Sequence, residues 1–144
     1  ALPISLSTLS IEEVINYDGP FFPADRAHFL QRWINQPQGT ALGILQNGKL
    51  SGYGVIRACQ EGFKIGPLMA DSEELAERLF GALKSHASNG APLFLDTPAV
   101  NRAAIALAER HGMTVSFQTA RMYLGEVPTF PADRLFGVTS FELG

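Results

Sequence analysis

The sequence predicts an α/β (α+β) domain: a mixed, mostly antiparallel sheet with a central β-α-β crossover and flanking helices. Three observations carry this prediction. Asn47-Gly48 separates two apolar runs and is a strong hairpin signal, because both residues accept positive φ. Apolar residues then recur at helical spacing over 75–86. The short apolar run 93–95 follows, and it suits a buried parallel strand reached by a right-handed crossover.

The first three strands are expected at 40–45, 50–59 and 63–69, as an antiparallel meander. Pro67 lies inside the third strand and has no N–H to donate to a neighbour. We therefore expect this strand to bulge or to part from its neighbour at Gly66-Pro67, which would leave an open cleft.

The remaining elements follow from helix and turn signals. Residues 1–21, with a short helix after Ser10, are expected to be a connector, and 22–144 to form the domain. A helix is expected from Pro23 to the stop at 37–39. Asp71 and Glu74 have the spacing of a capping box for the next helix. A last helix at 101–110 and late strands at 113–123 and 136–143 complete the order α-β-β-β-α-β-α-β-β.

The composition limits the class of protein and its partners. Of the 144 residues, 46% are hydrophobic and 17% charged, which excludes disorder driven by charge, and no apolar run approaches the ~20 residues of a membrane span. The net charge is −3 and basic residues do not cluster, so neither nucleic acid nor a membrane is an expected partner. One cysteine and no charged apolar leader predict a cytoplasmic protein. Because the chain begins at Ala1, a processed or excised piece of a longer protein is also expected.

Other motifs point away from redox, metal and dinucleotide chemistry. Cys59 has no nucleophile-elbow glycines around it and is interpreted as structural. His28, His86 and His111 lie far apart without paired ligand spacing, so no metal is expected. The glycines of 52–54 lack the third glycine of a dinucleotide fingerprint and are expected to permit close packing.

From Phe22 onward, several blocks recur in the order seen in the acyl-CoA-dependent N-acetyltransferases of the GNAT superfamily. The chain resembles, more specifically, the C-terminal half of two-domain GNAT proteins. The resemblance implies a GNAT-like fold whose parting strands hold acetyl-CoA as co-substrate. It rests on Trp33, 52–57 (Gly-Tyr-Gly-Val-Ile-Arg), 64–68 (Lys-Ile-Gly-Pro-Leu), 94–98 (Phe-Leu-Asp-x-Pro), Asn101, 111–113 (His-Gly-Met), 119–123 (Thr-Ala-Arg-Met-Tyr) and 136–139 (Phe-Gly-Val-Thr).

The resemblance also implies which residues bind the co-substrate. In the superfamily a glycine-rich loop and a helix N-terminus hold the CoA pyrophosphate with backbone N–H groups. Here the aligned loop is 71–76, where Asp71 and Glu74 put negative charge in place of glycines, and an Asp71 cap would occupy the donors. This charge argues against ordinary CoA binding. The implied cofactor contacts are Leu68, Met69, Ala70, Asp71 and Asn101.

The implied catalytic residues depart from the family pattern as well. The family tyrosine that protonates the leaving thiolate would stand seven residues after Asn101, where this chain has Ala108. Tyr123 is the alternative acid, and Asp96 and Arg121 are candidate substrate contacts.

Two hypotheses therefore stand. The domain transfers an acetyl group from acetyl-CoA to a small-molecule or peptide amine, with Tyr123 as acid and the backbone amides of 68–70 holding the thioester carbonyl. Alternatively, it is a non-catalytic GNAT-like half that binds ligand or packs against a partner, either a second GNAT domain of a parent chain or a second copy in a homodimer.

Overall fold

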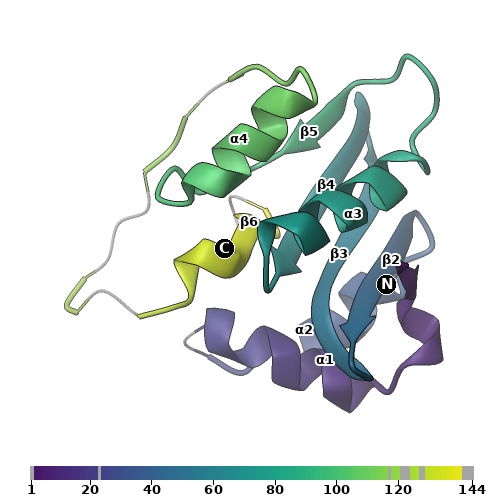
Figure 1. Cartoon of the computed structure of the whole chain (residues 1–144), viewed down its shortest axis with the longest axis vertical. Helices are drawn as coiled ribbons and strands as arrows, with labels where there is room; N and C mark the ends of the chain where they lie inside the picture. Colours follow the sequence, from purple (N-terminus) through teal and green to yellow (C-terminus); the bar gives the residue numbers. More distant parts are fainter. Residues whose placement is uncertain (1, 23, 117, 121–123, 127–128, 141–144) are drawn as a thin grey trace.

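The computed structural model describes residues 2–22, 24–116, 118–120, 124–126 and 129–140, and these form a six-stranded sheet with helices on both faces (Figure 1). The strand order is β1-β2-β3-β4-β5, with β6 paired to β4. The strands are β1 (Ile4–Ser5), β2 (Gly39–Gln46), β3 (Lys49–Cys59), β4 (Gly62–Ala70), β5 (Leu93–Leu95) and β6 (Leu135–Gly137). The helices are α1 (Ile11–Asp18), α2 (Ala27–Ile34), α3 (Glu73–Lys84) and α4 (Arg102–Arg110), with 3₁₀ turns η1 (Leu6–Thr8), η2 (Gly19–Phe21) and η3 (Ala132–Arg134).

The predicted meander and crossover are confirmed. Strands β2, β3 and β4 pair antiparallel, and Asn47 and Gly48 turn the first hairpin with φ of 52° and 74°. Helix α3 then carries the chain to β5, which lies parallel to β4. The mixed, mostly antiparallel sheet predicted from the sequence is therefore present.

The predicted irregularity in β4 is also present. Gly54 pairs with Leu68 and Ile56 with Ile65, so Val55 of β3 faces two residues of β4, Gly66 and Pro67. An extra residue of this kind is a β-bulge, and proline is tolerated there because no ladder hydrogen bond is needed from it. The indole Nε1 of Trp33 in α2 donates to the Gly66 carbonyl at 3.0 Å, which fixes the bulge against the helix.

Each face of the sheet has its own core. Helices α3 and α4 pack on one face around Leu79, Phe80 and Leu107, and α1 and α2 pack on the other around Val14 and Leu30. The glycines of 52–54 permit close approach, as predicted: a Cβ on Gly54 would lie 2.7 Å from Leu83 Cδ1 of α3.

The described residues 2–21, which we expected to be a connector, pack on the sheet. Ile4 and Ser5 form β1 and pair with β2, and Leu6, Val14 and Phe21 are buried in the core on the α1/α2 face. Apolar residues that a connector would leave in water here complete a core, which stabilises this stretch on the sheet.

Helix α2 begins at Ala27, four residues after the predicted start. The carboxylate of Asp25 accepts the Ala27 N–H at 3.0 Å, and the backbone of Arg26 is non-helical at φ −129°. The Arg26 side chain binds Asp18 instead, and this contact holds the preceding residues out of the helix.

The late strands also differ from the prediction. Residues 113–116 and 118–120 form no strand, and the last strand among the described residues is β6. It ends because the Val138 N–H leaves the ladder and donates to the Asp96 carbonyl at 2.9 Å. The predicted strand residues 117, 121–123 and 141–143 lie outside the described residues. None of the helices in the described part of the chain combines the length and apolarity needed to cross a bilayer.

Candidate functional site

The place where β4 and β5 part is the site that the sequence singled out. The two strands pair only between 63–65 and 93–95. Beyond Ile65 the edge of β4 is taken by β6, with Leu68 opposite Gly137 and Met69 opposite Leu135 (Figure 1). The expectation of an open cleft is therefore wrong: residues 135–140, which we name the cleft segment, lie where the strands diverge.

The cleft segment is closely packed, and all six of its residues are buried. A Cβ on Gly137 would lie 2.6 Å from Leu95 Cδ1 of β5 and 3.3 Å from Leu68 Cβ of β4, so its backbone sits between the two strands. A Cβ on Gly66 would lie 2.5 Å from the Val138 carbonyl oxygen. Glycine is thus required at position 66, where the near atoms are backbone, whereas at 137 the nearest atom is the end of the Leu95 side chain, which can move.

Asn101 connects the cleft segment to α4. It is buried, and its side-chain oxygen accepts the Ala104 N–H at 3.2 Å as the N-cap of the helix. Its Nδ2 donates to the Leu135 carbonyl at 2.9 Å and to the Asp133 carbonyl at 3.4 Å. The amide predicted to contact a co-substrate is engaged by the chain itself.

The predicted capping box at α3 is wrong, since Ser72 and not Asp71 is the N-cap. The Ser72 hydroxyl accepts the Leu75 N–H at 3.3 Å, and the helix begins one residue later than a cap at 71 would give. Glu74 pairs with Arg78 one turn along at 2.7 Å instead of reaching back. The serine has the β-region backbone that an N-cap requires, with φ −148° and ψ 163°.

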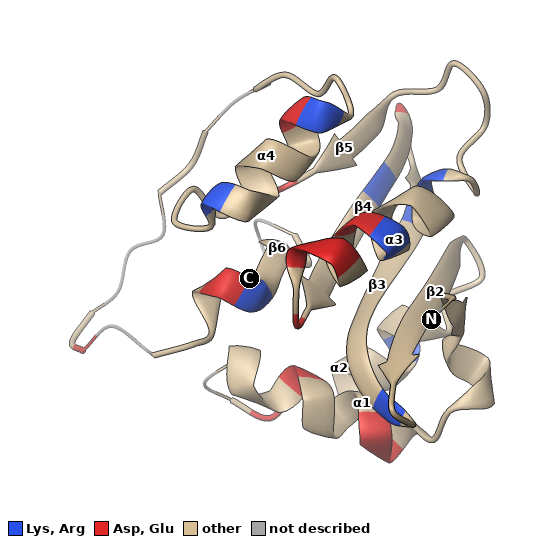
Figure 2. Ribbon diagram, in the orientation of Figure 1, with Lys and Arg blue, Asp and Glu red and all other residues tan. Residues whose placement is uncertain are grey.

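Asp71, which precedes α3, is instead bonded to side chains of α1 and η3. Its Oδ1 accepts from the Tyr17 hydroxyl at 2.8 Å and from Arg134 Nη1 at 3.1 Å. Figure 2 shows the acidic start of α3 in red, beside the charged residues of η3. Burial, with the Asp71 carboxylate next to the hydroxyl, raises the pKa of Tyr17. Arg134 therefore balances the charge of Asp71, while Glu74 pairs with Arg78.

A second, buried network was missed by sequence reasoning. The Asp18 carboxylate accepts two hydrogen bonds from the Arg26 guanidinium, both at 2.8 Å, and one from the Tyr53 hydroxyl at 2.5 Å. Arg26 also donates to Thr139 Oγ1 of the cleft segment at 3.2 Å. Burial and the adjacent Asp18 raise the pKa of Tyr53, so its hydroxyl stays protonated and donates.

A sequence signal for this network existed. The pentapeptide Phe-Pro-Ala-Asp-Arg occurs at 22–26 and again at 130–134. Both of its arginines, Arg26 and Arg134, bind aspartates beside the cleft segment, and Tyr17 packs edge-on against Tyr53 between the two pairs with ring centroids 6.2 Å apart.

The remaining predicted site residues fall into two groups. Asp96 follows β5 and pairs with Lys64 of β4 at 2.5 Å, with both side chains largely buried. Beside them the Arg57 guanidinium lies 5.1 Å from the Trp33 ring centroid. Tyr123 and Arg121 lie outside the described residues. The cleft segment and the preceding turn thus contact Leu68, Met69, Asp71, Asp96 and Asn101, whereas the proposed acid is not placed.

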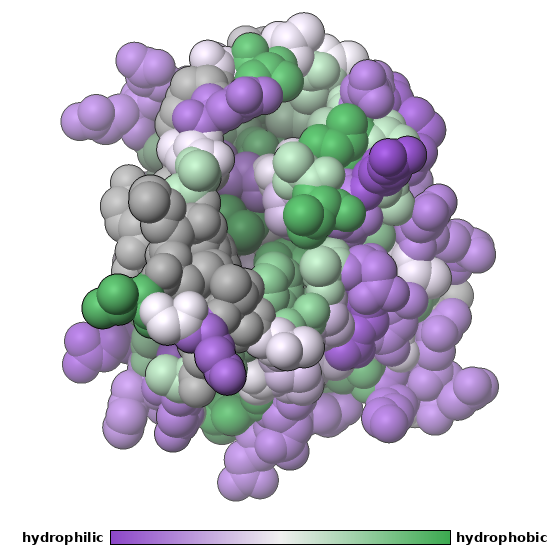
Figure 3. All heavy atoms as spheres, turned by 90° about the vertical axis from the view of Figure 1, so that its left-hand side faces the viewer, coloured by the Kyte–Doolittle hydropathy of each residue, from purple (hydrophilic) through white to green (hydrophobic). Residues whose placement is uncertain are grey.

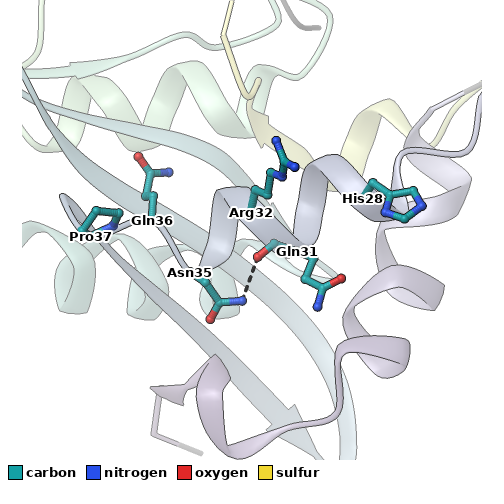
Figure 4. A pocket seen from close by; sticks show the side chains of 6 residues that line it. All are labelled: His28, Gln31, Arg32, Asn35, Gln36 and Pro37. Atoms are coloured by element: carbon teal, nitrogen blue, oxygen red, sulfur yellow. Dashed lines mark hydrogen bonds between the residues drawn. The ribbon is translucent and has the colours of Figure 1, made fainter.

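One hollow of the described residues lies along α2, away from this site. A polar depression of about 660 Å³ follows α2 and is lined by His28, Gln31, Arg32, Asn35, Gln36 and Pro37, whose side chains Figure 4 shows along the helix. No cluster of three or more potential metal ligands occurs within the described ranges. Figure 3 shows a hollow with hydrophobic residues in green on part of its rim and hydrophilic residues in purple toward the edges of the view.

The sequence was compared with protein families and with curated proteins. The family model described as "Acetyltransferase (GNAT) domain" matches residues 14–137. A curated relative, holothin acyltransferase of Pseudoalteromonas sp. (strain SANK 73390), is 26% identical over 135 residues, which are 94% of this chain and 46% of the relative. The chain thus spans about half the length of that relative.

Solved structures share the fold. A proposed acetyltransferase from Pyrococcus horikoshii superposes with a TM-score of 0.73 at 20% identity, over 100% of this chain and 46% of its own. The ribosomal-protein-alanine N-acetyltransferase of Brucella melitensis biovar Abortus 2308 gives 0.61 at 15% identity, over 85% of this chain and 97% of its own. An aminoglycoside acetyltransferase from an uncultured soil metagenomic sample gives 0.60 at 15% identity, over 87% and 94%. With the family model matching most of its length, the chain belongs to the GNAT acetyltransferase family.

Proposed function

We propose that this domain serves the transfer of an acetyl group from acetyl-CoA to an amine, as the whole or as a part of an N-acetyltransferase. The observation that carries the proposal is the parting of β4 and β5 after Ile65, at a bulge and just before α3, in a chain whose family uses acyl-CoA as co-substrate. The backbone of Leu68, Met69 and Ala70, together with Asp71 and Asn101, remains the proposed wall of the co-substrate site.

The residues present do not fit acyl-CoA in this conformation. The β4 edge at Leu68 and Met69 is paired with β6, and the Asn101 amide is bonded to the Leu135 carbonyl. This conformation therefore supports no reaction step through the co-substrate. Tyr123 is kept as the proposed acid, and Asp96 and Arg121 as proposed contacts for the acceptor.

The proposed acceptor is a small-molecule or peptide amine. The structural neighbours named above include an enzyme for ribosomal-protein alanine and one for aminoglycosides, so both kinds of amine occur among proteins of this fold. The proposed partner is a second GNAT domain of a parent chain or a second copy of this one, because the chain spans 46% of two relatives. A cytoplasmic location without metal remains part of the proposal.

The test is isothermal titration with acetyl-CoA, followed by detection of free CoA thiol with a panel of amines. The unmodified domain is compared with the isosteric pair Asp71→Asn/Glu74→Gln, which removes two of the three acidic charges at the start of α3 and leaves Glu73. The matched control is Glu12→Gln/Glu13→Gln, an equal charge change in the first turn of α1. Micromolar binding and amine-dependent thiol release support the proposal. If the charge argument holds, affinity rises in the first pair and not in the control. Binding without turnover would favour the non-catalytic alternative.

A further inference from the structure

We infer that the cleft segment, residues 135–140, is a displaceable occupant of the acyl-CoA cleft, so that this segment and acyl-CoA use the edge of β4 in turn. The inference rests on the proposed function. It adds a regulatory step to that function, since the domain must open before it binds its co-substrate.

The first argument is that the cleft segment fills the space between β4 and β5. The backbone of β6 pairs with Leu68 and Met69, and the Val138 N–H donates to the Asp96 carbonyl. Gly137 lies between Leu68 and Leu95, where an added Cβ would reach the end of the Leu95 side chain at 2.6 Å and the Leu68 Cβ at 3.3 Å. A ligand cannot enter between β4 and β5 while these contacts persist, because interiors packed this closely have few voids larger than a water molecule.

The second argument is the position of the polar contacts, which hold the segment at its two ends. Arg134 pairs with Asp71 just before β6, and Thr139 accepts from Arg26 after it. The Arg134 and Asp71 side chains are 31% and 40% exposed, and ion pairs at such exposure contribute about 0–1 kcal/mol. This end of the segment is therefore weakly fastened.

The third argument is the shortness of the pairing. Strand β6 has three residues, and its register with β4 is irregular between Leu68 and Met69. Between α4 and η3, residues 113–116, 118–120, 124–126 and 129–131 form neither helix nor strand, and most of these are exposed. A pairing of three residues has few backbone hydrogen bonds, so β6 can leave β4 by a local opening that keeps β2, β3 and β4 paired.

Hydrogen exchange with mass spectrometry on the unmodified chain tests the inference without any substitution. Acetyl-CoA is expected to increase deuterium uptake in peptides covering 132–140 while it decreases uptake in those covering 66–71. An ordinary ligand would protect both regions. Protection of 132–140 on binding would overturn the inference.

A disulfide lock supplies the second measurement. A Cβ at position 137 would lie 3.3 Å from Leu68 Cβ, close to the roughly 3.5–4.5 Å of disulfides, so Leu68→Cys/Gly137→Cys in a Cys59→Ser background should crosslink β4 to the segment. The same protein reduced with a phosphine is its own control. The oxidised form should bind acetyl-CoA at least about tenfold more weakly than the reduced form, because its open state is removed.

The outcomes separate the inference from the proposed function. Equal affinity of the oxidised and reduced forms, with 132–140 still protected, overturns the inference and leaves the proposed function standing. If the reduced form shows rapid exchange in 132–140 yet neither it nor the unmodified chain binds acetyl-CoA, the proposed function fails and the inference fails with it.

Discussion

The side-chain amide of Asn101 donates to the backbone carbonyl of Leu135 at 2.9 Å, while the oxygen of the same side chain caps α4. One buried residue thus serves a helix terminus and the strand beside it. Since both partners are backbone groups, the contact fixes the chain path whatever side chains stand at 104 and 135. The start of α4 and the cleft segment are therefore coupled through a single amide.

Substitution of Asn101 separates these two roles. Asn101→Ser retains a hydroxyl acceptor for the Ala104 N–H but removes the donor to the Leu135 carbonyl, whereas Asn101→Ala removes both. We expect the alanine variant to lose about 2–4 kcal/mol of unfolding free energy, from a lost cap and an unsatisfied buried carbonyl. The serine variant should lose about 1 kcal/mol less, the value of the cap. Urea unfolding measures both, and equal losses would show that the cap contributes nothing.

The capping role of Ser72 gives a second prediction. Ser72→Ala should destabilise the domain by about 1 kcal/mol, because the Leu75 N–H loses its acceptor. Asp71→Ala should cost less, about 0–1 kcal/mol, since its pair with Arg134 is partly exposed. Thermal unfolding of the two variants gives the comparison. A larger loss for Asp71→Ala than for Ser72→Ala would contradict Ser72 as the cap.

The buried pair of Asp18 and Arg26 gives a third prediction. Arg26→Met leaves a carboxylate that is 1% exposed with Tyr53 as its remaining hydrogen-bond donor among those described, and removal of one partner of a buried ion pair typically costs about 3–5 kcal/mol. The double variant Asp18→Leu/Arg26→Met also removes the unpaired Asp18 carboxylate and should recover part of the lost unfolding free energy. Urea unfolding at neutral pH measures the series. A double variant less stable than Arg26→Met would contradict the explanation by an uncompensated charge.

The sequence predicts the scaffold well because its signals are local. The turn at Asn47 and Gly48, the apolar stripe of α3 and the proline that forces the bulge each act within a few residues. Such signals are read directly from spacing and from backbone preference. The same locality explains the error at α3, where Asp71 and Ser72 are both good caps and only the tertiary partners of Asp71 decide between them.

The site is predicted less well because its contacts are distant in sequence. Arg26 meets Thr139 across 113 positions, and Asn101 meets Leu135 across 34. No spacing rule links such residues, and the apolar run around Phe136 is compatible with any partner strand. The resemblance to GNAT proteins indicated which residues surround the cleft. It did not predict that β6 fills the cleft, because the pairing of β6 with β4 is a contact between residues far apart in the sequence.

Tyr123 provides a prediction for the proposed catalytic role. If its hydroxyl is the acid, Tyr123→Phe should lower kcat by about 10²–10⁴-fold with little change in the affinity for acetyl-CoA, as for other general acids. The turnover assay with an active amine and a parallel titration separate the two effects. Tyr17→Phe is the matched control, since it removes a phenol hydroxyl that bonds Asp71. An equal loss in both variants would argue against Tyr123 as the acid.

The buried hydroxyl of Tyr53 predicts the stability of the domain at alkaline pH. Its pKa in the folded state is raised above the ordinary value of 10.0, because burial and Asp18 oppose the phenolate. Below pH 10 folded and unfolded chains both hold this proton, so the contribution is fully present there. Above pH 10 the unfolded chain releases the proton while the folded chain keeps it, and the unfolding free energy should fall by up to about 1.4 kcal/mol per pH unit. Urea unfolding between pH 8 and 11 should show this decline in the unmodified chain and a shallower decline in Tyr53→Phe. The unfolding free energy of Tyr53→Phe should be lower already at neutral pH, because Asp18 loses a hydrogen-bond donor. Parallel declines in the two proteins would mean that Tyr53 does not control alkaline stability.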